Sequence, residues 1–180
     1  VFLVSILTGI AGGVVAEANE PTALMVDECT RNLEGVCRRI DLAKVTRDAI
    51  ASAIEGASVV EGEPNGRSIV VVHLVDDGGF DRSRLKTILS VHITEFVVVA
   101  PNESDARGPI ILTARVEIRS ADAVRSETRV LTSDIGRKEE LDWEALDSGD
   151  TDRFNRSAEK MIRLAVKSLA SALVRSLSNS

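Results

Sequence analysis

Residues 110–119 read Ile-Ile-Leu-Thr-Ala-Arg-Val-Glu-Ile-Arg, the most regular alternation of apolar and polar residues in the chain. One set of alternate positions is entirely apolar and comprises Ile110, Leu112, Ala114, Val116 and Ile118. The other set is mostly polar and includes Arg115, Glu117 and Arg119. Because successive side chains of a strand point to opposite faces, this pattern predicts a β-strand with one buried and one solvent-facing side.

Three further segments predict strands around this one: residues 68–75, 89–99 and 124–132. The first is apolar on both faces, which is typical of a covered central strand. The second becomes continuously apolar at Phe96, so the step from Glu95 to Phe96 indicates either a bulge or a change in what covers the sheet. The last three strands follow one another through short connections, so they are predicted to form an antiparallel meander.

Two amphipathic helices are expected. The first covers residues 41–55, with Asp41 as its N-cap and Gly56 just beyond its end. The second covers residues 152–177, capped by Asp150 or Thr151. Its apolar residues recur at helical spacing and form one buried stripe: Phe154, Ala158, Met161, Ala165, Leu169, Leu173 and Leu177.

The order of these elements predicts an α+β protein. We expect a four-stranded, largely antiparallel sheet packed against two long amphipathic helices, in a single domain of residues 41–178. Residues 80–88 are predicted to form a short helix. Residues 133–149 are predicted to form an acidic loop held by Trp143 and Leu146.

The first eighteen residues indicate export. The first sixteen residues carry no charge, and Ala16-Glu17-Ala18 matches the small-residue end of a secretory signal peptide. We therefore predict a signal peptide over residues 1–18 and a periplasmic or secreted protein. An uncleaved membrane anchor is the alternative, although sixteen helical residues span only about 24 Å of a hydrocarbon core roughly 30 Å thick.

Residues 19–40 are predicted to form an irregular lead-in before the domain, cross-linked through the two cysteines, Cys29 and Cys37. An even cysteine count at short spacing in an exported protein predicts a disulfide. A continuous helix would hold the two Cα atoms about 12 Å apart, so a bridge also requires a break, which we expect at Gly35. Free thiols and a metal site are the alternatives, and two thiols without a nearby histidine fill only half of a tetrahedral zinc shell.

Composition argues against nucleic acid as a partner. The chain has 22 basic and 28 acidic residues, so its net charge is −6, and the basic residues are scattered. Phosphate binding requires a basic stripe. The chain also has no Tyr, one Trp and four Phe, which leaves few rings for stacking on bases.

Candidate catalytic residues are few. His73 and His92 lie in predicted strands as possible cross-strand neighbours, with Asp76 or Glu95 as a carboxylate for a metal site. Glu95 is three residues from His92, so the two are expected on opposite faces of the strand. The carboxylates Asp76, Asp77 and Asp81 surround Gly78 and Gly79, and the spacing predicts a strand-ending turn rather than an EF-hand loop.

Motifs for covalent catalysis and for phosphate binding are not recognisable in the sequence. We therefore predict a protein without enzymatic activity and without a cofactor. A hydrolase or metal enzyme that uses His73, His92 and Asp76 is the least favoured of the three functional classes weighed.

Residues 69–178 resemble small envelope proteins of Gram-negative bacteria. The resemblance is carried by Leu89-Ser90-Val91-His92-Ile93-Thr94-Glu95-Phe96, the alternating strand over 111–119, a turn near Asp122, Arg129-Val130-Leu131 and the Ala-rich helix over 158–177. These segments are similar to the ABC-type transport auxiliary lipoproteins, to the lipopolysaccharide-assembly lipoprotein and to periplasmic domains related to curli secretion. The resemblance implies a non-catalytic role in a transport or assembly machine. Those families usually carry a lipidated cysteine after the leader, and this chain has none near Ala18.

The expected function is that of an exported accessory domain of the cell envelope. Its partner would be an envelope protein, bound at the exposed face or the edge of the sheet, where strand 124–132 is expected to lie. The alternative is a periplasmic module that binds a lipid or a small apolar ligand in a groove between helix 154–177 and the Val-rich sheet.

Overall fold

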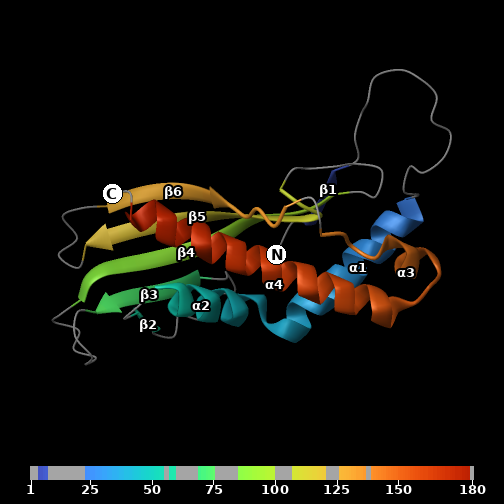
Figure 1. Ribbon diagram of the computed structural model, residues 1–180, viewed down its shortest axis with the longest axis horizontal. Coiled ribbons are helices and arrows are strands. Elements are labelled where there is room, and N and C mark those ends of the chain that lie inside the picture. The colour runs from blue at the N-terminus through green and yellow to red at the C-terminus, as the bar shows by residue number, and fades with distance from the viewer. Residues whose placement is uncertain are drawn as a thin grey trace, which may run out of the picture.

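The computed structural model describes residues 4–7, 23–54, 57–59, 69–75, 85–99, 107–120, 126–136 and 139–178. These residues contain six strands, β1 (Val4–Leu7), β2 (Ala57–Val59), β3 (Ile69–Val75), β4 (Leu85–Val99), β5 (Ile110–Ser120) and β6 (Ser126–Thr132). They also contain four helices, α1 (Ala23–Ile40), α2 (Leu42–Ala53), α3 (Trp143–Asp147) and α4 (Thr151–Ser178). Helix α4 runs along the sheet, with α2 beside it and α1 crossing it toward the other end (Figure 1).

The strands form one sheet in the order β2-β3-β4-β5-β6, and every neighbouring pair along this path is antiparallel. The short strand β1 pairs with β4 in parallel, outside that path. The predicted α+β class and the predicted antiparallel meander are therefore confirmed. The numbers differ: the described residues form six strands rather than four, and α1 adds a third long helix to the two that were predicted.

Strand β4 contains an irregularity that changes the direction of its side chains. Its pairing with β5 shifts between Ile93 and Glu95, so a bulge is present, one or two residues before the step from Glu95 to Phe96. Before the bulge, Leu89 and Val91 face the helices, and after it Phe96 and Val98 do. The bulge thus keeps one apolar face buried along both halves of the strand. The strand also begins at Leu85, so the short helix predicted over 80–88 is wrong for residues 85–88.

The predicted irregular lead-in is wrong for the residues that the structure describes, because they form α1. Its buried residues Cys29, Leu33 and Val36 are spaced by four and three positions, which is one face of a helix. Gly35 lies on the exposed face of the same helix and does not interrupt it. Since these buried residues belong to the main core cluster, α1 is an integral part of the domain.

Asp41 ends one helix and begins the next. Its backbone adopts a left-handed conformation with φ 49°, and its N–H donates to the Arg38 carbonyl. Its side-chain Oδ1 accepts from the Lys44 N–H at 3.2 Å, which is the predicted N-cap of α2. Asp150 caps α4 in the same way, because its Oδ1 accepts from the Arg153 N–H at 3.1 Å. Of the two residues proposed as the cap of α4, Asp150 is confirmed.

The core has two connected parts between the helices and the sheet. The larger joins α1, α3 and the first half of α4 to the ends of β4 and β5, through residues such as Leu33, Phe96, Ile110, Phe154 and Ile162. The smaller joins α2 and the second half of α4 to the middle of the sheet: Ile50, Leu89, Val91, Ala114, Val116, Leu169, Ala170 and Leu173. The predicted stripe of α4 is buried from Phe154 to Leu173, and Leu177 is half-buried.

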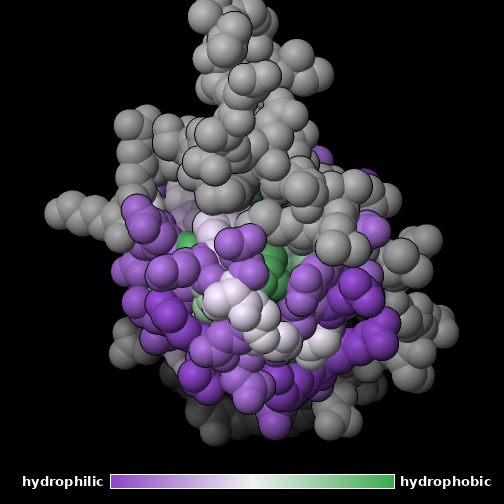
Figure 2. Space-filling view, turned by 90° about the vertical axis from the view of Figure 1, so that its right-hand side faces the viewer, coloured by the Kyte–Doolittle hydropathy of each residue, from purple (hydrophilic) through white to green (hydrophobic). Residues whose placement is uncertain are grey.

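The surface at the end formed by α1, α3 and the start of α4 is mostly hydrophilic, and hydrophobic residues show only near its centre (Figure 2). Within the segment predicted as an acidic loop, Trp143 opens the short helix α3 and its ring lies 6.2 Å from that of Phe154. None of the described helices combines the length and the hydropathy that a membrane span requires.

Candidate functional site at the edge of the sheet

The strongest candidate site lies where β6 ends the sheet. Three cross-strand pairs place side chains of β5 and β6 on the face turned away from the helices: Arg115 opposite Val130, Glu117 opposite Thr128, and Arg119 opposite Ser126. The alternation that predicted β5 explains this face, because its other set of positions is buried against the helices. Within the described part of the chain, no further strand pairs with β6.

Val130 is the unusual residue of this edge. It is 69% exposed and is the large hydrophobic residue that stands out on the described surface. Its neighbours Arg129 and Leu131 in the strand point the other way and are half-buried. An exposed β-branched residue on an edge strand favours pairing with another extended chain.

The backbone of β6 also offers groups for pairing. The Ser133 N–H donates to the Leu112 carbonyl at 2.8 Å, which makes these two residues a hydrogen-bonded pair of the antiparallel ladder. Such pairs alternate along the ladder, so Leu131, Arg129 and Glu127 bond toward β5. The alternation therefore directs the N–H and carbonyl groups of Thr128 and Val130 away from β5, toward the edge.

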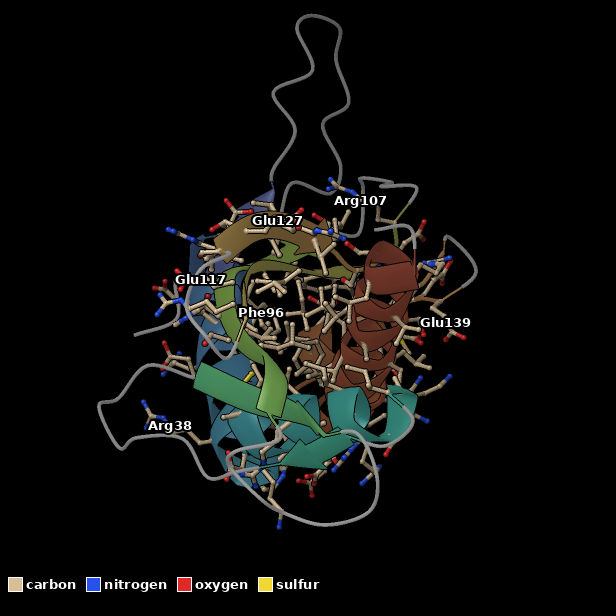
Figure 3. All side chains as sticks on the ribbon, turned by 90° about the vertical axis from the view of Figure 1, so that its left-hand side faces the viewer. Arg38, Phe96, Arg107, Glu117, Glu127 and Glu139 are labelled. Carbon is tan, nitrogen blue, oxygen red and sulfur yellow. The ribbon has the colours of Figure 1, made fainter. Side chains whose placement is uncertain are left out.

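Charged residues flank the exposed valine on the outer face. Glu117 accepts from Arg119 at 2.8 Å and lies 3.4 Å from Arg115, so one carboxylate bridges two guanidinium groups along a single strand. Both arginines are more than half exposed. Glu117 lies on the outer side of the sheet, whereas Phe96 points to the interior between the sheet and α4 (Figure 3). The row of Arg115, Glu117 and Arg119 therefore carries one net positive charge beside an apolar side chain.

On the inner face, β6 is tied to the end of α4 by Arg129. The guanidinium donates to both carboxylate oxygens of Glu127, at 2.7 and 3.0 Å. It also donates to the carbonyl oxygen of Ser176 and, at 2.6 Å, to the Ser176 Oγ. The hydrogen bond from Arg129 lowers the pKa of Glu127, and the same bond raises the pKa of Arg129. Contacts with α4 thus hold the inner face of the edge strand, whereas its outer face is exposed to solvent at Val130.

Two serines fix the chain directly after β6. The buried Ser133 Oγ accepts from the Leu112 N–H at 2.8 Å, in the place where a carbonyl would continue the ladder. Ser168 of α4 accepts from the Asp134 N–H at 2.8 Å and donates to the Asp134 carbonyl at 2.7 Å. These contacts hold the end of the strand against β5 and α4. A partner that binds at the edge would therefore meet a preformed strand.

The predicted disulfide is not formed in the structure. Cys29 and Cys37 are both free thiols, and they are eight positions apart within the uninterrupted helix α1. At a helical rise of about 1.5 Å per residue, their Cα atoms are about 12 Å apart, far beyond the reach of a bridge. Burial raises the pKa of Cys29 to about 12, and burial together with the nearby Glu34 raises that of Cys37 to about 11. Both thiols are therefore protonated at neutral pH.

The two histidines are not brought together by the sheet. His92 of β4 is paired with Ile69, and His73 of β3 is paired with Ile88, four positions away along the same ladder. Four strand residues correspond to about 13 Å, so the prediction that the histidines are cross-strand neighbours is wrong. In the described part of the chain, no three His, Cys, Asp or Glu side chains are close enough to share a metal ion. Asp76, Asp77 and Asp81 lie outside the described residues.

Glu95 lies on the same face as His92, contrary to the prediction. Glu95 is paired with Thr113 and His92 with Arg115, and these two partners are alternate residues of β5. The bulge between Ile93 and Glu95 inserts an extra residue, which reverses the expected relation of the two side chains.

A second surface feature is a groove of about 560 Å³ between α2 and α4. Apolar side chains of both helices line it, including Val45, Ala49, Val166 and Ala170. Asp48 stands on the α2 side, and Arg163 and Lys167 stand on the α4 side. The groove differs from the one expected between the terminal helix and the sheet, because that space is filled by the two core clusters.

Comparison of the chain with protein-family models, with curated proteins and with solved structures finds no match. The sequence led us to expect strand 124–132 at an edge of the sheet, and β6 has that position among the described residues. The contact of Arg129 with Ser176 was not predicted, because the two residues are 47 positions apart and neither belongs to a recognisable motif.

Proposed function

We propose that this protein is an exported, non-enzymatic accessory domain of the cell envelope that binds an envelope protein by strand addition at β6. The observation that carries the proposal is Val130, which is 69% exposed in the last strand of the sheet. Strand addition draws its affinity from main-chain hydrogen bonds and its specificity from alternate side chains. Thr128 and Val130 supply edge-directed backbone groups, and Val130 supplies a side chain that an apolar partner residue would cover.

The clamped position of β6 supports this proposal. Binding to a mobile segment costs the free energy of ordering it, whereas β6 is already held by Arg129, Ser133 and Ser168. The charged row of Arg115, Glu117 and Arg119 stands beside the edge and would select against a partner strand with a basic residue opposite it.

Export is the second part of the proposal and rests on the uncharged segment before Ala16-Glu17-Ala18. Expression of the chain in a Gram-negative host, followed by osmotic release of the periplasm and N-terminal sequencing, tests it directly. We expect the released protein to begin at Asn19. Recovery of the protein only from the cytoplasm, with its N-terminus intact, would contradict export without bearing on the edge of β6.

Site-specific crosslinking tests the interaction. A photoreactive phenylalanine derivative would replace Thr128 in one variant and Arg156, an exposed residue of α4 outside the groove, in a matched control. We expect irradiation of intact cells to join the Thr128 variant to one discrete envelope protein and the Arg156 variant to none. The same products from both positions, or none from Thr128, would contradict binding at the edge.

Binding of a lipid or small apolar ligand is a second candidate, favoured by the groove between α2 and α4. Its apolar lining and Lys167 on one rim suit an amphipathic ligand with an acidic head group, while Arg163 on the same rim is paired with Glu159. Native mass spectrometry of the purified protein should then show a bound molecule that is lost when Ser52, on the rim, is replaced by Trp. A spectrum of the unmodified protein with no added mass would remove this candidate.

A further inference from the structure

The long strand β4 has two different neighbours along one edge. Strand β3 pairs with its first part, from Leu85 to His92, and β1 pairs with its last part, from Phe96 to Val99. The change of neighbour occurs at the bulge between Ile93 and Glu95. The two parts of this edge are therefore separate pairing sites.

The pairing of β1 with β4 is unlike every other pairing in the described sheet. It is parallel, it covers four residues, and it joins positions about ninety residues apart in the sequence, Val4 with Phe96 and Leu7 with Val99. Parallel pairs are slightly weaker per residue than antiparallel ones, and a strand of four residues forms few hydrogen bonds, so the pairing of β1 is expected to open more easily than the other pairings. Moreover, β1 lies within the segment that the sequence predicts to be removed as a signal peptide.

The site on β4 is apolar and has a defined backbone pattern. Phe96, Val98 and Val99 are 1%, 0% and 5% exposed. The Val99 N–H donates to the Pro109 carbonyl at 2.9 Å on the β5 side. By alternation, Phe96 and Val98 direct their N–H and carbonyl groups to the other side, where β1 lies. An unoccupied site would leave these groups unpaired next to the core, which is unfavourable for any group shielded from water.

The sequence of β1 indicates which kind of segment can pair with this part of β4. Strand β1 reads Val-Ser-Ile-Leu, without a charge, and it is followed by uncharged residues up to Ala16. We infer that the edge of β4 at Phe96–Val99 is a strand-acceptor site for an uncharged, β-branched segment that runs parallel to β4. Val4–Leu7 fills the site in the full chain, and a segment of the same character from an envelope partner replaces it once the leader is removed. This site is distinct from the edge of β6, and its release in the cell rests on the removal of the leader proposed above.

The register supplies a matched pair of variants. In a parallel pair, the edge-directed groups of Phe96 and Val98 bond to residues that flank their Cα partners, which makes Ser5 and Leu7 the bonding residues of β1. Ser5→Pro in the full chain should therefore release β1, whereas Ile6→Pro should leave the bonding groups in place. The probe is a fluorescent peptide with the sequence of residues 1–8, followed by lysines for solubility.

Fluorescence anisotropy should show that the peptide binds the Ser5→Pro chain at least tenfold more tightly than it binds the unmodified or the Ile6→Pro chain. A peptide with Pro at its own fifth position should not bind. Equal binding to all three chains, or binding to none, would overturn the inference. This assay needs no export and no cellular partner. The strand-acceptor site can therefore be disproved while the proposed function stands, and the proposed function can be disproved while the acceptor site stands.

Hydrogen exchange on the unmodified chain keeps the inference testable if Ser5→Pro does not fold. The amides of Phe96 and Val98, which face β1, should exchange at least tenfold faster than those of Val97 and Val99, which face β5. Equal, slow exchange of all four amides would show that β1 does not leave its site, and the inference would then be wrong.

Discussion

Arg115 and Val130 lie directly opposite each other across the β5–β6 pair, on the face of the sheet that the helices do not cover. A long cationic side chain and an exposed aliphatic one thus stand side by side at the edge of the sheet. Natural edge strands are commonly protected by charges or by a covering element. On the inner face of β6 the charge of Arg129 is used to bind Ser176 of α4, whereas on the outer face Val130 remains exposed. We interpret this asymmetry as a strand that is held in place and presented for binding.

Gly35 offers a direct test of the continuous helix α1. A Cβ added at this position would meet nothing within 4 Å, and the backbone is helical. Gly35→Ala should therefore raise the free energy of unfolding by about 0.5–1 kcal/mol in urea denaturation, because glycine loses more backbone entropy on folding than alanine does. Gly149→Ala is the control: that site is equally open, but its φ is +77°, and we expect destabilisation by about 1 kcal/mol. A loss of stability in Gly35→Ala would argue for the break that the disulfide required.

Asp41 combines a left-handed backbone with an N-cap, and three substitutions separate the two roles. Asn keeps both properties, so Asp41→Asn should change the free energy of unfolding by less than about 0.5 kcal/mol. Gly keeps only the backbone freedom, and Ala keeps neither. We expect Asp41→Ala to cost about 1–2 kcal/mol and Asp41→Gly to fall between the other two. Equal effects of Ala and Asn in thermal or urea unfolding would show that neither the cap nor the left-handed backbone contributes to stability.

The clamp behind β6 is tested by comparing two arginines. Arg119 and Arg129 each pair with a glutamate two residues away, but only Arg129 is also bonded to Ser176 of α4. Arg119→Ala should change stability by less than about 0.5 kcal/mol, as is usual for an exposed ion pair. Arg129→Ala should lower the free energy of unfolding by more than Arg119→Ala does, and it should increase hydrogen exchange over the last turn of α4. Equal effects of the two substitutions would show that the contact with Ser176 does not hold the helix.

The thiols of α1 give a prediction that depends on pH. Denatured without reductant, the protein should react with two equivalents of a thiol reagent, and native protein at pH 8 should react at least about tenfold more slowly because both thiols are protonated. The folded pKa values exceed the 9.0 of an ordinary thiol. The stability that the buried thiols contribute is therefore complete below pH 9 and is lost as the pH rises toward 11 and 12. A mass about 2 Da below that of the reduced protein, together with no reactive thiol, would show a disulfide and would contradict free thiols at Cys29 and Cys37.

The meander and the terminal helix could be predicted from the sequence because their patterns are regular. Alternation over residues 110–119 specifies which face of β5 is buried, and the spacing of Phe154, Ala158 and Met161 specifies one face of α4. Asp41 was predicted as a cap because a carboxylate directly before an apolar helical repeat satisfies the first free N–H groups.

The remaining features depend on contacts that local patterns do not contain. In α1 the spacing of Cys29, Leu33 and Val36 is helical, but two cysteines flanking Gly35 favoured a disulfide loop. Residues 85–88 have helical spacing, but this segment pairs with β3, and Thr87 and Ile88 also pair with β5, so it is extended. At the candidate site, the sequence predicted an edge strand. The exposure of Val130 depends on where the sheet ends, which only the folded chain reveals.

The central claim is that a partner chain pairs with the backbone of β6, and two substitutions at Val130 test it most directly. Because the Val130 N–H is directed away from β5, Val130→Pro removes an edge donor while leaving the β5–β6 ladder intact, and Val130→Thr keeps both the donor and the β-branched shape. The measurement is the yield of the crosslink from a photoreactive residue at Thr128 in each background. We predict that the yield is retained in Val130→Thr and falls at least tenfold in Val130→Pro, with both proteins folded by circular dichroism. Equal yields in the two backgrounds would contradict strand addition at this edge.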